Sequence, residues 1–203
     1  MPRDIGILLP GSAQSASMIS AVTVPGFLSA DECAQLIAVA EDRGMARAGL
    51  TGGLKAGNIR SASSCWIDED DVSWLADKMI RGLATLARQS FDYDLTGFEE
   101  GFQLLRYDGL EVDGEPDFYD WHIDIGRSGV NASRKLSLVV QLSDPSDYEG
   151  GLLEVNAAGN VEAQPRAIGC LTAFPSFVLH RVSPVTKGVR YSLAAWAHGP
   201  AFR

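Results

Sequence analysis

The chain has 203 residues, of which 46% are hydrophobic and 21% charged, and its formal net charge is −9. This length fits one domain over residues 1–203 with a substantial buried core. The acidic balance argues against a protein that binds the phosphate backbone of nucleic acids. No apolar run approaches the ~20 residues that cross a bilayer, and the first residues lack the apolar stretch of a signal peptide. We therefore expect a cytoplasmic protein with no nucleic-acid or membrane partner.

The cysteines also favour a cytoplasmic protein. Cys33, Cys65 and Cys170 are odd in number, widely spaced and free of any CxxC pair. This pattern argues against a disulfide framework or a zinc ribbon and favours reduced thiols. Each cysteine is predicted to be a small buried side chain.

Two helices are predicted in residues 20–95, which form a helical support region. The first begins with a capping box, Ser29 to Glu32, and ends at Gly44 after apolar residues at helical spacing. The second spans about 71–90, where apolar residues form one stripe, so we expect it to lie against a sheet. Between them, residues 49–66 are rich in Gly and Ser and predict a loop that leads into a strand ending near 65–67.

The character of the sequence changes from Phe98 onward. Short segments of β-branched, aromatic and leucine residues alternate there with turns of Gly, Pro, Asp and Asn. This spacing favours antiparallel strands in a sandwich or barrel and not βαβ units. The predicted fold class is α+β and mainly β, with a barrel or double sheet in residues 96–200 backed by the N-terminal helices.

The segment YDWHIDIG (119–126) contains the first candidate site residues. If residues 119–125 are extended, His122 and Asp124 lie side by side on one face of the strand. A second histidine, His180, lies on another predicted strand. Two imidazoles and one carboxylate can hold Fe(II) while leaving positions open, and zinc accepts the same ligand types. An HxD motif by itself also fits a polar pair in the core, so both interpretations stay open at this point.

Arg190 adds a second observation. It follows His180 by ten residues and shares a predicted strand face with Ser192. A buried guanidinium needs an anion, because an unpaired buried charge is costly, and its planar fork matches a carboxylate. Arg190 could instead pair with a surface acid. Together with the two histidines and the aspartate, the pattern favours a site for a keto-acid that chelates a metal and has a distal carboxylate.

Residues from about 98 to 200 resemble the Fe(II)/2-oxoglutarate-dependent dioxygenases of the prolyl 4-hydroxylase-like group. Their last segment is particularly similar to PKHD-type hydroxylases. The resemblance covers about half the chain and rests on five segments in order: LLRYDG (104–109), YDWHID (119–124), RKLSLVVQLS (134–143), EGGLLEV (149–155) and FPSFVLHRVSPVTKGVRYSLAAW (174–196).

The resemblance implies a double-stranded β-helix, or jelly roll, and a set of site residues. It implies that the iron ligands are His122, Asp124 and His180. It also implies a co-substrate site in which the distal carboxylate of 2-oxoglutarate binds Arg190 and Ser192. Further residues of the implied site are Tyr107, which lines the co-substrate pocket, Gln141, where some relatives carry a tyrosine that reaches the co-substrate, and Tyr119 and Trp196 on the pocket wall. Packing in the core is the alternative for Tyr107 and Trp196, and His198 is not included as a ligand.

The implied cofactors are Fe(II), 2-oxoglutarate and O2, with ascorbate as a reductant. The implied activity is hydroxylation of an unactivated C–H with release of succinate and CO2. The substrate would be a peptidyl residue such as proline, a free amino acid or another small molecule. The polar loop 109–118, which carries acids, and the segment 49–64 would flank the entrance. Their composition favours a basic or hydrogen-bonding substrate, and ordinary solvated loops with no part in specificity are the alternative. Monomer and homodimer both stay open.

Two other functions are compatible with part of this pattern. A metal-binding sensor or binding barrel of cupin-like architecture would keep the two histidines and Asp124 but gives no reason for Arg190 and Ser192. A zinc hydrolase would need a general base beside the metal, and no further acid lies close to the motifs in sequence.

Overall fold

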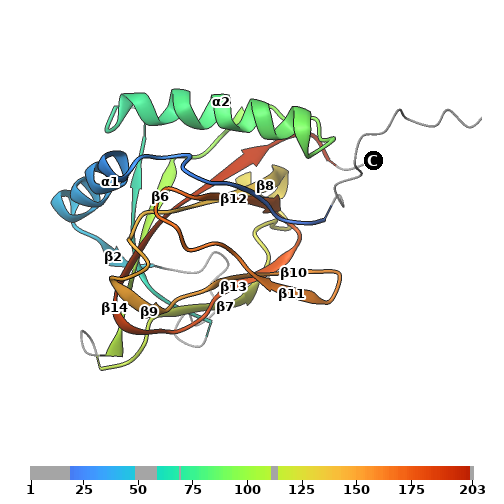
Figure 1. Ribbon diagram of the computed structural model, residues 1–203. Helices are drawn as coiled ribbons and strands as arrows, with labels where there is room; N and C mark the ends of the chain where they lie inside the picture. Colours follow the sequence, from blue (N-terminus) through green and yellow to red (C-terminus); the bar gives the residue numbers. More distant parts are fainter. Residues whose placement is uncertain (1–18, 49–58, 69, 111–113, 202–203) are drawn as a thin grey trace, which may run out of the picture.

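The computed structural model describes residues 19–48, 59–68, 70–110 and 114–201 (Figure 1). Its helices are α1 (Ala30–Arg43) and α2 (Ser73–Gln89), with a 3-10 turn, η2, at Val130–Ser133. The strands of the larger sheet are β1 (Val22–Val24), β2 (Ala46–Arg47), β4 (Ser63–Ile67), β5 (Gly97–Phe98), β6 (Phe102–Asp108), β8 (Arg134–Gln141), β9 (Tyr148–Gly150), β12 (Leu171–Pro175) and β14 (Val185–His198). The strands of the smaller sheet are β3 (Arg60–Ser61), β7 (Phe118–His122), β10 (Leu153–Ala157), β11 (Asn160–Ala163) and β13 (Leu179–Val182).

The two sheets form two of three layers. The larger sheet has the order β1-β12-β8-β14-β6-β4-β2, with β5 and β9 pairing onto the long β14, and the smaller has the order β11-β10-β13-β7-β3. In Figure 1 the helix α2 lies above the larger sheet, and the smaller sheet lies below it. The strand pairs are antiparallel. The predicted class, a mainly β fold of two facing sheets backed by N-terminal helices, is confirmed.

The capping box places α1 where the sequence predicts it. The Ser29 hydroxyl accepts a hydrogen bond from the Glu32 amide at 3.2 Å, and the Glu32 carboxylate accepts one from the Ser29 amide at 2.7 Å. Two backbone donors that would otherwise be unpaired at the start of the helix are thereby satisfied. Gly44 ends the helix with a φ of 73°, which glycine adopts without steric cost.

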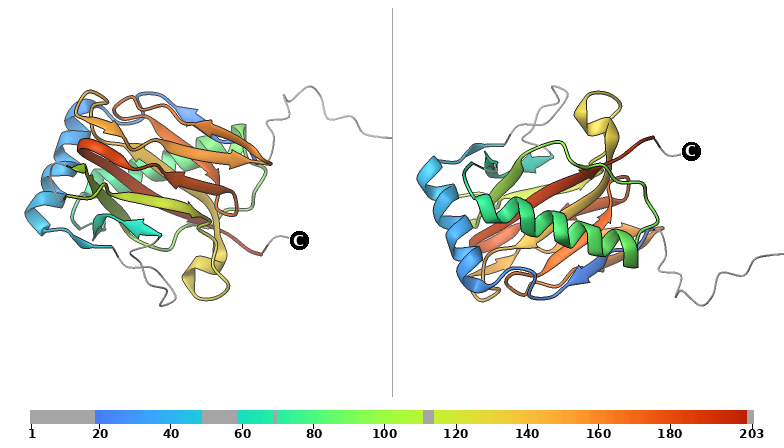
Figure 2. Two further views of the ribbon diagram at one scale, coloured as in Figure 1. Left: turned by 90° about the horizontal axis from the view of Figure 1, so that it is seen from below. Right: turned by 90° about the horizontal axis from the view of Figure 1, so that it is seen from above.

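Helix α2 begins at Ser73, slightly later than predicted, and crosses the larger sheet (Figure 2, right). Its buried residues are Leu75, Met79, Leu83 and Leu86. Lys78 lies next to this stripe but its ammonium bonds both carboxylate oxygens of Glu32 at 2.6 Å. The second helix is therefore held against the sheet by apolar burial and tied to α1 by an ion pair.

Alternation along the central strands separates two apolar regions. Leu104 of β6 and Leu193 of β14 lie in the core shared with the helices. Their neighbours Leu105 and Ala194 face the space between the sheets, together with Tyr107. Because successive side chains of a strand point to opposite faces, the larger sheet is buried on both sides, and its inner face forms one wall of the interior.

One predicted strand ends early. The sequence predicts an extended segment over 119–125, but β7 ends at His122 and Asp124 lies in the turn that follows. The Asp124 amide donates to the carbonyl of Ser176 at 2.8 Å. Ser176 lies in the connection before β13, so the backbone of Asp124 bonds to this connection and not to β13. Ile123, between His122 and Asp124, is 47% exposed.

Other expectations lie partly outside the described residues. Of the Gly- and Ser-rich segment, residues 49–58 are outside, and the remainder forms β3 and β4, the latter ending at Ile67 as predicted. Residues 1–18 also lie outside the described ranges. Cys33 and Cys170 are buried, Cys65 is half-buried, and all three are free thiols. Within the described ranges, the helices lack the length and apolar character that crossing a bilayer requires.

Candidate functional site

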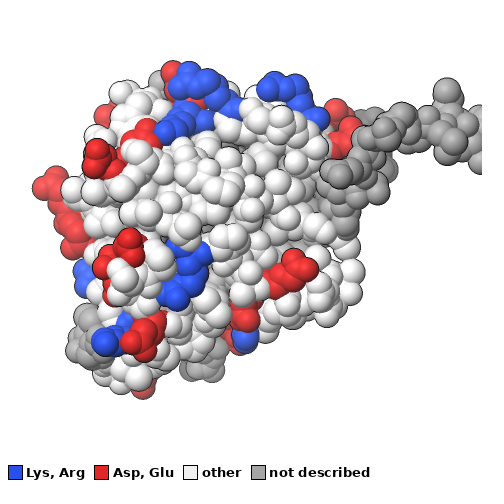
Figure 3. All heavy atoms as spheres, viewed as in Figure 1, with Lys and Arg blue, Asp and Glu red and all other residues white. Residues whose placement is uncertain are grey.

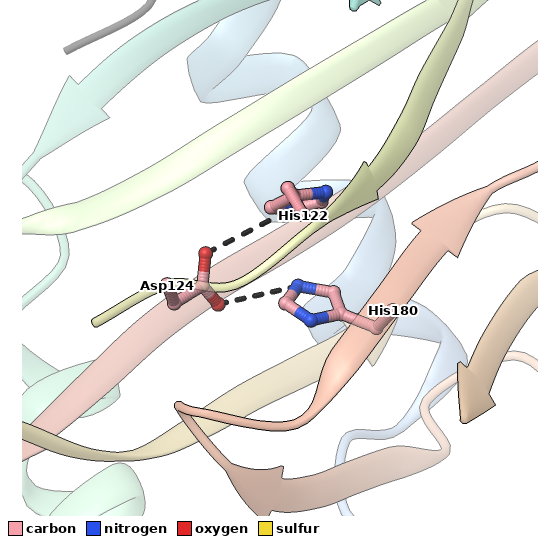
Figure 4. Close-up of side chains that lie close together, drawn as sticks. All are labelled: His122, Asp124 and His180. Atoms are coloured by element: carbon pink, nitrogen blue, oxygen red, sulfur yellow. Dashed lines mark ion pairs between the residues drawn. The ribbon is translucent and has the colours of Figure 1, made fainter. Parts of the chain in front are cut away.

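The two histidines and the aspartate of the sequence pattern meet in the interior (Figure 4). His122, at the end of β7, and His180, on β13, are direct register partners across the smaller sheet. The Nε2 atom of His180 lies 3.3 Å from one carboxylate oxygen of Asp124, and that of His122 lies 3.7 Å from the other. The three ligand atoms lie within 4.8 Å of one another. One metal ion can therefore contact all three.

Backbone carbonyls determine which nitrogen each imidazole offers. Nδ1 of His122 lies 2.7 Å from the carbonyl of Asp120, and Nδ1 of His180 lies 3.0 Å from that of Val178. Because a carbonyl only accepts, Nδ1–H of each ring is the donor, and Nε2 of the neutral ring has a free lone pair. Both lone pairs point at the carboxylate of Asp124, and a cation between them satisfies all three groups.

Asp124 is held in place by hydroxyl groups. The Ser137 hydroxyl donates to the carboxylate at 2.6 Å and lies 3.1 Å from the Ser176 hydroxyl. Burial alone would raise the pKa of Asp124, but the nearby His180 and His122 imidazoles and the Ser137 hydrogen bond bring that pKa well below its ordinary value. The carboxylate is thus ionised at neutral pH, as a metal ligand must be.

His122 is kept neutral by its surroundings. Burial, followed by the proximity of His180, lowers the pKa of His122 from 6.5 to about 4. The ring of Tyr119 stacks on its imidazole with centroids 3.4 Å apart and an interplanar angle of 13°. Burial in turn raises the pKa of Tyr119 to about 12. A neutral imidazole with a fixed ring plane is ready to bind a cation without first losing a proton.

Arg190 is fully buried and has no acidic partner among the described residues. Its guanidinium donates from Nη2 to the Gln141 side-chain oxygen at 2.9 Å and from Nη1 to the Ser192 hydroxyl at 3.3 Å. No described residue accepts a hydrogen bond from its Nε. The predicted strand face shared by Arg190 and Ser192 is confirmed. Because a buried guanidinium without an anion is costly, this arrangement fits a ligand that carries a carboxylate.

A small cavity of about 40 Å³ lies between the sheets beside these groups. Site residues that line it are His122, Asp124, His180, Ser192, Tyr107, Tyr119 and Trp196. The guanidinium of Arg190 lies over the Tyr107 ring, with Cζ 5.2 Å from its centroid. The walls of this cavity thus bring together the predicted ligand triad with Ser192, Tyr107, Tyr119 and Trp196. Arg190 and Gln141 do not line it, but Arg190 contacts Tyr107, which does.

A wider pocket of about 480 Å³ adjoins this cavity and shares five lining residues with it: Arg60, Gln103, Tyr119, Asp124 and Trp196. Trp196 is 7% exposed and lies under the guanidinium of Arg134, whose Cζ is 3.8 Å from its ring centroid. Trp66 lies 5.8 Å from Trp196, centroid to centroid. Aromatic rings and guanidinium groups therefore line the wider pocket beside the inner cavity.

Known proteins resemble this chain in sequence. The family model of the 2OG-Fe(II) oxygenase superfamily matches residues 102–198. Residues 102–198 belong to this superfamily. A PKHD-type hydroxylase of Hyphomonas neptunium is 36% identical over 90 residues, which are 43% of this chain and 40% of that protein. A PKHD-type hydroxylase of Synechococcus elongatus is 37% identical over 128 residues, 62% of this chain and 56% of that protein. The chain spans about two fifths of the first of these relatives.

Solved structures resemble the whole described fold. A prolyl-4-hydroxylase of Pseudomonas putida superposes with a TM-score of 0.70 and 20% identity, over 93% of this chain and 97% of that one. A prolyl hydroxylase from Trichoplax adhaerens, solved with a hypoxia inducible factor peptide fragment, gives a TM-score of 0.71 and 19% identity over 88% and 83% of the two chains. At these identities the likeness concerns the fold, and it confirms the jelly roll around the oxygenase region.

Several contributors to the site are not predicted from the sequence. Ser137 bonds Asp124, and Gln141 bonds Arg190, whereas the sequence suggests for Gln141 only a position near the co-substrate. The sequence does contain a sign that Ser137 and Gln141 have polar partners, because each is a polar residue inside the apolar strand segment RKLSLVVQL. Arg60, in a Ser-rich segment before β4, gives no such signal.

Proposed function

We propose that the chain is an Fe(II)- and 2-oxoglutarate-dependent hydroxylase. The observation that carries the proposal is the joint presence of a His122–Asp124–His180 triad and a buried Arg190 without an acidic partner, beside one cavity. The triad supplies two neutral nitrogens and one anionic oxygen, which suits Fe(II) with open coordination positions. Arg190 supplies the positive fork that a distal carboxylate requires.

The donor set supports iron at the triad. Two imidazoles with Nδ1 donating to carbonyls and one ionised carboxylate are the protein's side of a 2-His-1-carboxylate site. Bound there, Fe(II) with 2-oxoglutarate and O2 would supply the oxidative chemistry that hydroxylates a C–H and releases succinate and CO2. The chain would orient the ligands, and the apolar walls would exclude water.

Arg190, Ser192 and Gln141 support binding of 2-oxoglutarate. Arg190 and Ser192 present a guanidinium and a hydroxyl, and Gln141 fixes the guanidinium from the neighbouring strand. The aromatic ring of Tyr107 lies under the guanidinium and is itself buried. These contacts would orient the distal carboxylate so that the keto-acid end is directed toward the triad. The substrate, either a peptidyl residue or a small molecule, would enter through the wider pocket, and ascorbate would serve as reductant.

The alternatives give no account of Arg190. A sensor or binding barrel needs the metal ligands but leaves the fully buried guanidinium of Arg190 without an anion among the described residues. A zinc hydrolase needs a general base, and the charged residues that line the inner cavity, within the described part of the chain, are Asp124 and Arg60. Asp124 is already required as a ligand, so no second carboxylate remains there for proton transfer.

Anaerobic spectroscopy tests the proposal directly. Purified protein is mixed with Fe(II) and 2-oxoglutarate without oxygen, and the visible charge-transfer band of the chelate is recorded. We expect the band with the wild type and none with Asp124→Ala. Succinate release after addition of oxygen is then measured. Tight zinc binding with neither a band nor succinate would contradict the proposal and favour the sensor.

A further inference from the structure

Arg60, which lines the wider pocket beside the triad, is a second arginine, besides Arg190, for which the described residues provide no anion. Arg60 lies on β3 and is 7% exposed. Its Nε and Nη2 atoms are buried and have no hydrogen-bond partner among the residues that the structure describes. It lines both the wider pocket and the inner cavity. A buried donor without a partner costs about 1–3 kcal/mol, and more when it is charged, so the position calls for a ligand that accepts hydrogen bonds.

The other two arginines of this pocket already have acidic partners. Arg47 donates to the buried carboxylate of Asp117 at 2.7 Å. Arg134 makes a two-point contact with Glu100, at 2.7 and 2.5 Å. The charges of Arg47 and Arg134 are thus compensated within the chain. Arg60 also lines this pocket, but the described residues provide no acidic partner for it.

The iron and 2-oxoglutarate of the proposed function would not compensate the charge of Arg60. Fe(II) carries two positive charges, and Arg190 adds one. The Asp124 carboxylate and the two carboxylates of 2-oxoglutarate balance these three charges. The positive charge of Arg60 then has no counterpart, although it lies in the same low-dielectric interior, where an unbalanced charge is unfavourable. One more negative charge is needed to complete the site.

Ring contacts place Arg60 close to the reacting position. Its Cζ lies 4.7 Å from the Tyr119 ring centroid, and the same ring stacks on the imidazole of His122. Tyr119 therefore contacts both the guanidinium and a residue of the proposed ligand triad. An anion bound to Arg60 would hold the rest of a small molecule at the mouth of the inner cavity, beside the triad.

We propose that Arg60 binds a carboxylate of the substrate, so that the hydroxylated compound is an amino acid or a peptide segment that carries a free carboxylate close to the reacting carbon. This inference rests on the proposed function and specifies its substrate class. It departs from the expectation of a basic substrate drawn from the loop 109–118. Of the acids in that loop, Asp117 is 1% exposed and is bound by Arg47 and Ser61, so it does not present its charge to a substrate.

Binding without turnover tests the substrate class. Protein loaded with Mn(II) and 2-oxoglutarate is titrated anaerobically with each of the twenty free amino acids, and with capped peptides that contain Asp or Glu, while tryptophan fluorescence is followed. Trp66 and Trp196 line the pocket and report on its occupancy. For every ligand that binds, the matching amide is also measured. We expect the amide to bind roughly 10- to 100-fold more weakly, as the loss of a charge-assisted hydrogen bond implies.

Variants assign that discrimination to Arg60. Arg60→Met should remove the preference for acid over amide, and Arg60→Lys should retain part of it. Arg181→Met is the matched control, because its guanidinium also lies over an aromatic ring, 4.8 Å from that of Trp121, but pairs with Glu154 away from the pocket. The control should keep the full preference. The free amino acids and the capped peptides separate an α-carboxylate from an acidic side chain as the source of the charge.

The anaerobic Fe(II) and 2-oxoglutarate band separates failure of this inference from failure of the proposed function. If the band forms in the wild type but no carboxylate ligand binds, or acid and amide bind equally, the inference is wrong while the oxygenase proposal stands. If Arg60→Met loses the band, Arg60 serves the co-substrate and not the substrate, and the inference is again wrong. If the wild type forms no band, the proposed function itself fails.

Discussion

Arg190 and Gln141 meet across two neighbouring strands, where Nη2 of the arginine donates to the side-chain oxygen of the glutamine at 2.9 Å. Gln141 is the register partner of Ser192, which lies two residues beyond Arg190 on β14. The amide and the hydroxyl thus hold the guanidinium from two adjacent strands. Within the described part of the chain its Nε has no hydrogen-bond partner, so these residues orient the charge of Arg190 but do not neutralise it.

Replacement of Arg190 by lysine should weaken 2-oxoglutarate binding far more than iron binding. Lysine keeps the charge but cannot donate from a planar fork, and it cannot bond Gln141 and a carboxylate in the same geometry. We expect the concentration of 2-oxoglutarate needed for half-maximal anaerobic band intensity to rise roughly 10- to 100-fold. Arg181→Lys, on the outer face of the smaller sheet, is the control and should leave both requirements as they are. An unchanged 2-oxoglutarate requirement in Arg190→Lys would assign Arg190 another role.

Gly151 should be required for the position of Arg190. Its φ is +59°, and an added Cβ would lie 2.9 Å from Cδ of Arg190 and 2.8 Å from a methyl carbon of Val185. Gly151→Ala should therefore lower the free energy of unfolding by about 1–3 kcal/mol and also weaken 2-oxoglutarate binding. Urea unfolding and the anaerobic titration measure the two effects.

The control for this substitution is Gly159→Ala. Gly159 also has a positive φ, +89°, but an added Cβ would meet nothing within 4 Å. It should show the cost of backbone strain alone and leave 2-oxoglutarate binding unchanged. Equal effects of the two substitutions on binding would mean that Gly151 does not set the position of Arg190.

The fold was predictable wherever short-range chemistry decides it. The capping box at Ser29 and the stop at Gly44 depend on neighbours within one turn, and both lie where the sequence predicts them. The strands of the larger sheet have apolar side chains on both faces, and this explains why residues such as Leu104 and Leu105 are consecutive and both buried. Such local patterns are visible in one sequence without knowledge of the partners.

The site was predictable only in part, because part of it depends on long-range pairing. The HxD motif and a distant histidine suggest a triad, and the register of His122 with His180 brings the rings together. The end of β7 at His122 was not predictable, since it depends on the Ser176 carbonyl that binds the Asp124 amide. The position of Arg60 beside Tyr119 likewise comes from the pairing of β3 with β7, which no local pattern specifies.

Removal of the Asp124 carboxylate should abolish metal binding while leaving the fold intact. Asp124→Ala deletes the anionic ligand, and since loss of a residue that only supports a ligand costs 10–100-fold in metal affinity, we expect a loss of more than about 100-fold. Equilibrium dialysis with Co(II) measures the affinity, and far-UV circular dichroism checks the fold. Asp120→Ala is the control from the same segment, because its exposed side chain bonds only the Trp121 amide among the described contacts. Retained metal affinity in Asp124→Ala would remove Asp124 from the ligand set.

The metal-free protein should lose stability as the pH falls from 6.5 toward 4. The pKa of His122 is about 4 in the folded protein and near 6.5 when the chain is unfolded, mainly because burial disfavours the imidazolium. Between these values the unfolded chain binds a proton that the folded chain does not, so the free energy of unfolding rises with pH across this window. The full difference amounts to about 3 kcal/mol. Asp124 acts in the same direction but at lower pH, because its pKa is depressed below its ordinary value of 3.8.

Urea unfolding in the presence of a chelator, repeated across this pH range, measures the effect. In the His122→Gln variant the side chain at position 122 does not titrate in this pH range. The free energy of unfolding of the variant should therefore change less steeply between pH 6.5 and 4 than that of the wild type. The chelator keeps metal binding from contributing to the comparison. Parallel curves for the two proteins would show that His122 is not held neutral by burial in the folded state.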